Sequence, residues 1–109
     1  MIDALRVVLR HTGCRIVPQY PVAGYRVDIA VLADSAKIAV ECDGYAFHFS
    51  TPDQAANDKK RERALIINGF TVIRFTGKEI NEDAEACAGE VLTVLRQRRL
   101  KAYADTTKP

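Results

Sequence analysis

The chain has 109 residues, 48% of them apolar, which is enough for one domain with one compact core and leaves little room for a second. A net charge of +2 and an isoelectric point near 8.5 are too mild to indicate a nucleic-acid partner by themselves, so any such indication has to come from local clusters of basic residues. The three cysteines are odd in number and have no CxxC spacing, which excludes a disulfide framework and predicts reduced, mostly buried thiols.

The first segment, MIDALRVVLRHTG, is an apolar run that three charged residues interrupt: Asp3, Arg6 and Arg10. It therefore lacks the continuous hydrophobic stretch of a signal peptide or of a membrane span. We expect a cytoplasmic location and no membrane partner. The apolar residues from Ile2 to Leu9 recur at helical spacing and Gly13 follows, which predicts a first helix of about three turns.

Three strands are predicted next, each bounded by turn residues: Arg15–Tyr20, Tyr25–Leu32 and Lys37–Cys42. A second helix begins at Thr51, because Thr-Pro-Asp-Gln combines an N-cap, a proline at the first helical position and a capping box. This helix should run to about Asn68, before Gly69. A buried strand, Phe70–Phe75, and a last helix, roughly Glu82–Leu100, complete the pattern.

The resulting order is α-β-β-β-α-β-α. Short links between the first three strands require antiparallel hairpins, whereas a strand, a helix and a strand in succession require a parallel crossover. The fold class is therefore α/β (α+β), with a central mixed four-stranded sheet flanked by helices. We assign residues 1–102 to this single domain and expect residues 103–109 to be a flexible C-terminal tail.

The turn at Asp34-Ser35 sets the register of the hairpin between the second and third strands. Pairing Ala33 with Ala36 brings Asp28 opposite Glu41. One face then collects the apolar residues Val27, Ile29, Val31, Ile38 and Val40. The other face collects two small residues and three carboxylates: Ala30, Ala39, Asp28, Glu41 and Asp43.

Two carboxylates opposite each other on adjacent strands destabilise a sheet unless something compensates their repulsion. A divalent cation would do so, and oxygen ligands that converge from two strands suit Mg²⁺. The small neighbours Ala30 and Ala39 leave space for a ligand to approach. In the alternative interpretation Arg26, or a cation from a helix, neutralises the pair and the arrangement is only structural.

These residues resemble the PD-(D/E)xK nuclease superfamily, in particular the branch that contains very-short-patch repair endonucleases and the proteins of domain of unknown function 559. The resemblance covers most of the chain and adds a restriction-endonuclease-like identity to the predicted fold. It rests on an ordered set of residues: Gln19, Tyr25-Arg26-Val27-Asp28, Ile38-Ala39-Val40-Glu41-Cys42-Asp43-Gly44, His48, Asp58, Arg61, Leu65, Gly69 and Val72-Ile73-Arg74-Phe75.

The resemblance implies that Asp28 and Glu41 bind Mg²⁺ (or Mn²⁺) together with the backbone carbonyl of Cys42. Asp43 occupies the place of the superfamily's lysine and would be a further metal ligand. His48 would be the general base or electrostatic partner, its alternative being a loop histidine that only hydrogen-bonds a neighbouring aspartate. The branch often has a glutamate in the first helix, which Asp3 would have to replace here.

Nucleic-acid contacts are predicted from Lys59, Lys60 and Arg61 on the second helix, and from Gln19. Gln19 is also a candidate outer-shell ligand of the metal, its alternative being an exposed amide at the end of a strand. Asp58 and Arg61 lie one helical turn apart, so a simple surface ion pair is the alternative for them. A second basic cluster, Arg96 to Lys101, falls in the last turns of a helix, where the helix dipole favours cations without any ligand.

The sequence and the resemblance together predict a metal-dependent endonuclease that hydrolyses phosphodiester bonds, with DNA as the expected substrate. The rival interpretation is a catalytically inactive nuclease fold that binds nucleic acid or a protein partner. A chain of this size has one site, so cutting both strands would need a homodimer or a larger nuclease/helicase assembly.

Overall fold

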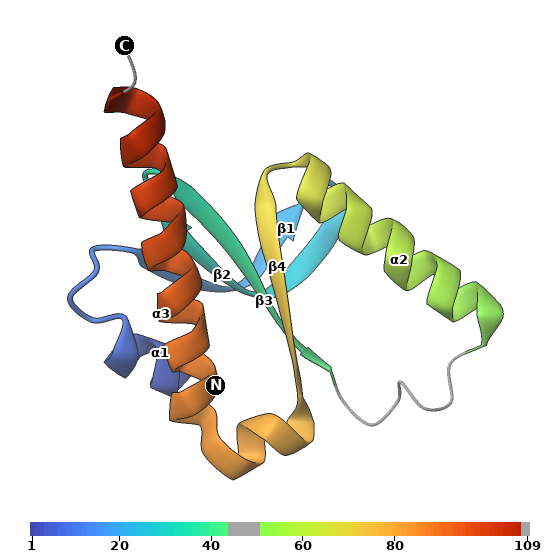
Figure 1. Ribbon diagram of the computed structural model, residues 1–109. Helices are drawn as coiled ribbons and strands as arrows, with labels where there is room; N and C mark the ends of the chain where they lie inside the picture. Colours follow the sequence, from blue (N-terminus) through green and yellow to red (C-terminus); the bar gives the residue numbers. More distant parts are fainter. Residues whose placement is uncertain (44–50, 108–109) are drawn as a thin grey trace.

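The structure of the chain is a computed structural model that describes residues 1–43 and 51–107. In these ranges the elements follow the predicted order, with these bounds: α1 Ile2–Val8, β1 Arg15–Val22, β2 Tyr25–Ala33, β3 Ala36–Asp43, α2 Pro52–Ile67, β4 Phe70–Thr76 and α3 Gly77–Thr107. Figure 1 shows α3 and α1 on one side of the sheet and α2 on the other.

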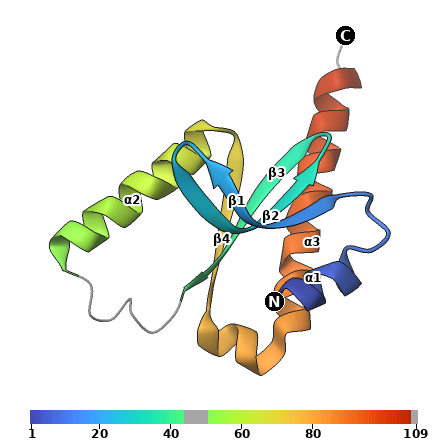
Figure 2. The same ribbon diagram turned by 180° about the vertical axis from the view of Figure 1, so that it is seen from behind.

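The four strands lie in the order β1-β2-β3-β4. The pairs β1–β2 and β2–β3 are antiparallel, and β3–β4 is parallel. This confirms the predicted mixed sheet, and the fold is restriction-endonuclease-like. The hairpin register is also confirmed from Ala33↔Ala36 to Ile29↔Val40. β1 and β4 are the two edges of the sheet. In Figure 1, β4 lies in front and β1 behind; Figure 2 shows the sheet from the other side, with β1 in front.

Two hydrophobic clusters hold the helices on the sheet. The larger one packs α1 and α3 against the centre of the sheet, and its fully buried members include Leu5, Ile38 and Leu95. The smaller one lies on the α2 face and is built around Leu65. The structure describes every residue of α2, and Leu65 is the one that is buried. The α2 face is therefore the weakly apolar side of the sheet.

Both outer helices differ in length from the prediction. α1 ends at Val8 because the hydroxyl and the N–H of Thr12 both donate to Leu9 O and close a turn, so the first helix is shorter than expected. α3 begins earlier, since Thr76 and Glu79 cap its start reciprocally. It also continues through Thr107, into the segment predicted to be loose, because no glycine or proline occurs between Gly89 and Pro109.

α3 is not one regular helix. Asp83 has an extended backbone (φ −161°, ψ 85°), and its carboxylate accepts the N–H of Ala86 at 3.0 Å. Asp83 thus caps a second, longer helical part, which starts close to the predicted position Glu82.

The strand alternation reverses where β1 and β2 pass Gln19 and Asp28. Gln19 has a positive φ of 51°, which is rare for a residue with a side chain. Val27 was expected on the same face as Ile29, but it packs in the smaller cluster with Leu65, whereas Ile29 packs in the larger one. The prediction for Val27 was wrong because a period of two holds only while the backbone stays regular.

The cysteines are free, but only Cys87 is buried, while Cys14 and Cys42 are half-buried. In the basic cluster of α3, Arg99 donates to Thr12 O at 2.6 Å and so fastens the helix to the segment after α1. Among the described residues, no helix is long and apolar enough to cross a membrane.

Candidate active site

One row of polar residues crosses the whole sheet. Glu41 on β3 pairs with Arg74 on β4. Asp28 on β2 and Gln19 on β1 continue the same row across the sheet, although neither residue has a backbone pair of its own. The backbone ladder is interrupted at Asp28, since its neighbour Ile29 pairs with Val40 while Asp28 has no backbone pair on β3. The row therefore coincides with the reversal of the two strands at Gln19 and Asp28.

Side chains replace the missing backbone pairing at this point. Asp28 Oδ2 accepts the N–H of Cys42 at 2.8 Å, and the N–H of Asp28 approaches Glu41 Oε2 at 3.4 Å. The two carboxylates are thus held side by side by the strand ends. The predicted juxtaposition of Asp28 and Glu41 is present, although it is built by side chains rather than by a regular ladder.

Glu41 is the charged side chain that the fold buries most deeply, with 3% of it exposed in the described part of the molecule. Burial raises the pKa of Glu41 from 4.5 to about 7, a hydrogen bond with Asp28 adds to the rise, and the charge of Arg61 opposes it. A carboxyl group in this state can lose or gain a proton near neutral pH.

Arg61 comes from α2, and its Nη2 lies 2.6 Å from Glu41 Oε1. The same guanidinium donates to the carbonyl of Arg26 at 2.7 Å. Oε1 of Glu41 is buried, and its partner in the described part of the molecule is the Arg61 guanidinium. The interpretation in which a helix cation neutralises the carboxylates therefore holds for Glu41, with Arg61 rather than Arg26 as the cation.

Arg74 connects the end of β3 to α2. It donates to both oxygens of Asp58, at 2.8 and 3.1 Å, and lies 3.2 Å from Glu62 and 3.6 Å from Asp43. The hydrogen bonds from Arg74 lower the pKa of Asp58, whereas burial raises the pKa of Asp43. Asp58 does not form the surface pair with Arg61 that its spacing suggested, because the arginine of β4 binds it instead.

Charge is unevenly distributed over this cluster. Two guanidinium groups, Arg61 and Arg74, contact four carboxylates, and a fifth carboxylate, Asp28, lies beside Glu41; the four are Glu41, Asp43, Asp58 and Glu62. An excess of carboxylates around a buried carboxylate is an environment in which a further cation would be stabilised. The donor set consists of oxygen atoms, which fits Mg²⁺ or Mn²⁺.

The three carboxylates among the predicted metal ligands do not converge as a ready-made site. Within residues 1–43 and 51–107, no group of three or more histidine, cysteine and acidic side chains lies in a position to hold a metal ion. The reason is visible in the contacts: Asp28 is bonded to the Cys42 N–H, and Asp43 is turned toward Arg74. Any shared ligand would require these carboxylates to exchange partners.

The other predicted site residues lie outside the carboxylate cluster or outside the described residues. Lys59 and Lys60 are exposed on α2, and Gln19 is exposed beside Asp28. Asp3 is 94% exposed on α1, which packs on the face of the sheet opposite α2, and it lies 3.9 Å from Arg6. His48 lies outside the described residues.

Sequence reasoning missed the roles of Arg74 and Glu62. Arg74 was a detectable candidate, since it is the one charged residue in the strand FTVIRFT and the parallel register places it beside Glu41. Glu62 carried no such signal, because a charged residue one turn after Asp58 on a polar helix is common.

The fold and this strand-end carboxylate cluster define a restriction-endonuclease-like protein. Residues 3–95 match the family REase_MTES_1575, so the chain belongs to this restriction-endonuclease-like family. An uncharacterized protein of Haemophilus influenzae (strain ATCC 51907 / DSM 11121 / KW20 / Rd) is 32% identical over 87 residues, which cover 80% of this chain and 69% of that protein. The domain is nuclease-like.

Proposed function

We propose that the protein is a Mg²⁺- or Mn²⁺-dependent endonuclease that hydrolyses phosphodiester bonds in DNA and belongs with the very-short-patch-repair-like branch. The observation that carries the proposal is the buried Glu41 carboxylate beside Asp28, in a cluster where carboxylates outnumber the guanidinium groups that contact them. A fold that only needed stability would fill this position with an apolar residue, because a buried carboxylate destabilises it.

In this mechanism Asp28 and Glu41 would hold the metal ion, and the carbonyl of Cys42 and the carboxylate of Asp43 would be further ligands. A bound Mg²⁺ supplies Lewis-acid activation of the phosphoryl group. Arg61 has to release Glu41, and its guanidinium is then free to pair with a phosphate of the substrate. His48 is the proposed general base for the attacking water.

The exposed side chains around the site would hold the nucleic acid. Lys59 and Lys60 point into solvent from α2, and Gln19 projects beside Asp28. Lysine contacts to phosphates position a backbone without reading bases, so they account for affinity and salt dependence rather than for sequence specificity.

The second candidate function is an inactive nuclease fold that binds nucleic acid or a protein partner. One observation favours it: Arg61 already neutralises Glu41, and Asp43 is turned toward Arg74. In such a module these ion pairs would be permanent, and the cluster would only fasten α2 to the sheet.

The test is calorimetric titration of Mg²⁺ and Mn²⁺ into the full chain, beside Asp28→Asn and Glu41→Gln, with Glu85→Gln as the control for removal of an exposed acid. An endonuclease should bind metal in the micromolar to millimolar range, lose binding in both site variants, and keep it in the control. It should also cleave nicked, mismatched or single-stranded DNA only with metal. DNA binding without metal dependence, unchanged in both variants, would establish the inactive module.

A further inference from the structure

The two edges of the sheet are protected differently. β1 contains Pro18 and Pro21, which have no N–H to offer, and the positive φ of Gln19 distorts the strand between them. β4 has the sequence FTVIRFT, with no proline and with its one charged side chain, Arg74, engaged in the site. No other described strand pairs with its outer side. A strand of this composition is a template for pairing with another strand.

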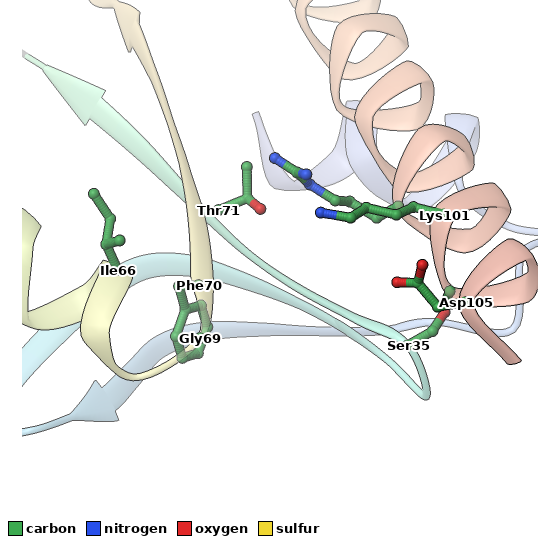
Figure 3. A pocket seen from close by; sticks show the side chains of 9 residues that line it. Ser35, Ile66, Gly69, Phe70, Thr71, Lys101 and Asp105 are labelled. Atoms are coloured by element: carbon green, nitrogen blue, oxygen red, sulfur yellow. The ribbon is translucent and has the colours of Figure 1, made fainter.

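The start of β4 is open between the helices. A hollow of about 400 Å³ lies at its first residues, Phe70 and Thr71, and is also lined by Ile66 of α2, by Arg98 and Lys101 of α3, and by Ser35 of the turn between β2 and β3. Figure 3 shows Ile66 on one side of the strand and Lys101 on the other. Ile66 is 56% exposed, and Figure 1 shows α2 running away from β4 beyond this end. A second strand could therefore approach the edge without meeting α2.

The charges of α3 are separated along its length. From Glu79 to Glu90 every charged residue is acidic, and from Arg96 to Lys101 every charged residue is basic. The helix follows β4 directly and returns along it, so that Arg98 lies beside the start of the strand. Two such helices side by side would attract each other when antiparallel and repel each other when parallel.

We propose that two copies of the chain associate through antiparallel pairing of their β4 edges. The two-fold axis of such a pair is perpendicular to the sheet, so the two α3 helices lie on the same face. α3 contacts both β3 and β4, so its axis lies roughly over the space between these two strands. With one strand spacing between the two paired β4 strands, the axes of the two α3 helices would be about 10 Å apart, which is an ordinary helix-packing distance.

The register follows from the centre of the strand. The middle residue of β4 is Ile73, two residues beyond Thr71, which shares the hollow with Arg98. Two strand residues correspond to about four helix residues, so the axis passes near Val94. Glu90 of each copy then lies opposite Arg98 of the second copy. The acidic half of each helix faces the basic half of the other, which is why the occupant is another copy of this chain.

The pairing also orders the two sites. Both α2 helices, and with them both Glu41 carboxylates, lie on the face opposite α3. Three strand spacings and a stagger of two residues separate the two Glu41 positions by about 16 Å. The association itself does not depend on catalysis.

The experiment is sedimentation velocity of the full chain at about 100 µM, with the charge-reversed variants Glu90→Arg and Arg98→Glu and their combination. Each single variant should weaken the dimer about tenfold, because it places two like charges opposite each other. The double variant should restore the dimer, because the acidic and the basic residue have then changed places and still attract each other. Arg96→Glu is the matched control, since Arg96 is equally exposed but does not line the hollow. Circular dichroism verifies that every variant is folded.

Amide hydrogen exchange supplies the second measurement. Dimerisation should protect the amides of β4 in a concentration-dependent manner and leave β1 unchanged. A chain that remains monomeric at this concentration overturns the proposal. So does a dimer whose stability ignores both single reversals, since it would use another surface.

Discussion

Replacing Glu41 with glutamine should stabilise the fold above neutral pH and leave it unchanged in acid. A pKa raised from 4.5 to about 7 means that the folded state prefers the protonated carboxyl by about 3 kcal/mol. Because the folded pKa lies above the unfolded one, the folded state keeps its proton longer, and wild-type stability falls as the pH rises from about 4.5 to 7. Glutamine does not titrate and is spared this loss.

The measurement is urea unfolding of wild type and Glu41→Gln between about pH 4 and pH 9. The variant should be equal in stability near pH 4 and gain at most about 3 kcal/mol at pH 8, a figure that already includes the attraction between Glu41 and Arg61. Glu85→Gln, at an exposed position of α3, serves as the control. A difference that is independent of pH, or a variant that is less stable at pH 8, would refute the assignment of Glu41 as a carboxyl group destabilised by burial.

Four further substitutions probe the neighbouring contacts and two glycines. Arg61→Gln should strengthen Mg²⁺ binding about fivefold in calorimetry, because a competing cation is removed from a buried carboxylate; weaker binding would show that Arg61 helps to form the site. Asp58→Asn should destabilise by about 1 kcal/mol in urea unfolding, since Arg74 loses a two-point contact that is only partly shielded from water, and no change would make that contact merely a surface pair. Gly69→Ala should lower the stability of the fold by about 1 kcal/mol or more in urea unfolding, because Gly69 has a φ of 89°. Gly89→Ala, inside α3 with open space around it, should raise the stability by about 0.5 kcal/mol. Equal effects of the two substitutions would contradict this argument.

Local patterns in the sequence were sufficient for most of the fold. The capping box at Thr51 predicts the start of α2, and the short turn at Asp34-Ser35 predicts the register that brings Asp28 to Glu41. Both depend on residues that are close in the chain, where turn geometry and hydrogen bonds leave few alternatives.

The remaining parts of the site depend on how elements are placed in space. The sequence pattern indicates which face of α2 is polar, but not where that face lies on the sheet, so the contact of Arg61 with Glu41 could not be read from it. The reversal at Gln19 was also hidden, because positive φ values are signalled by glycine and this position carries a side chain.

The attachment of α2 has a consequence for local opening of the molecule. Leu65 is the one buried residue of α2, and the helix is also held on the sheet by a hydrogen bond from Arg61 to the carbonyl of Arg26 and by ion pairs with Glu41 and Arg74. The free energy needed to detach it is therefore governed by the charge state of the site more than by apolar burial. A proton or a ligand that reaches these carboxylates changes how often α2 lifts from the sheet, and the exchange rates of its backbone amides become a direct report on the state of the site.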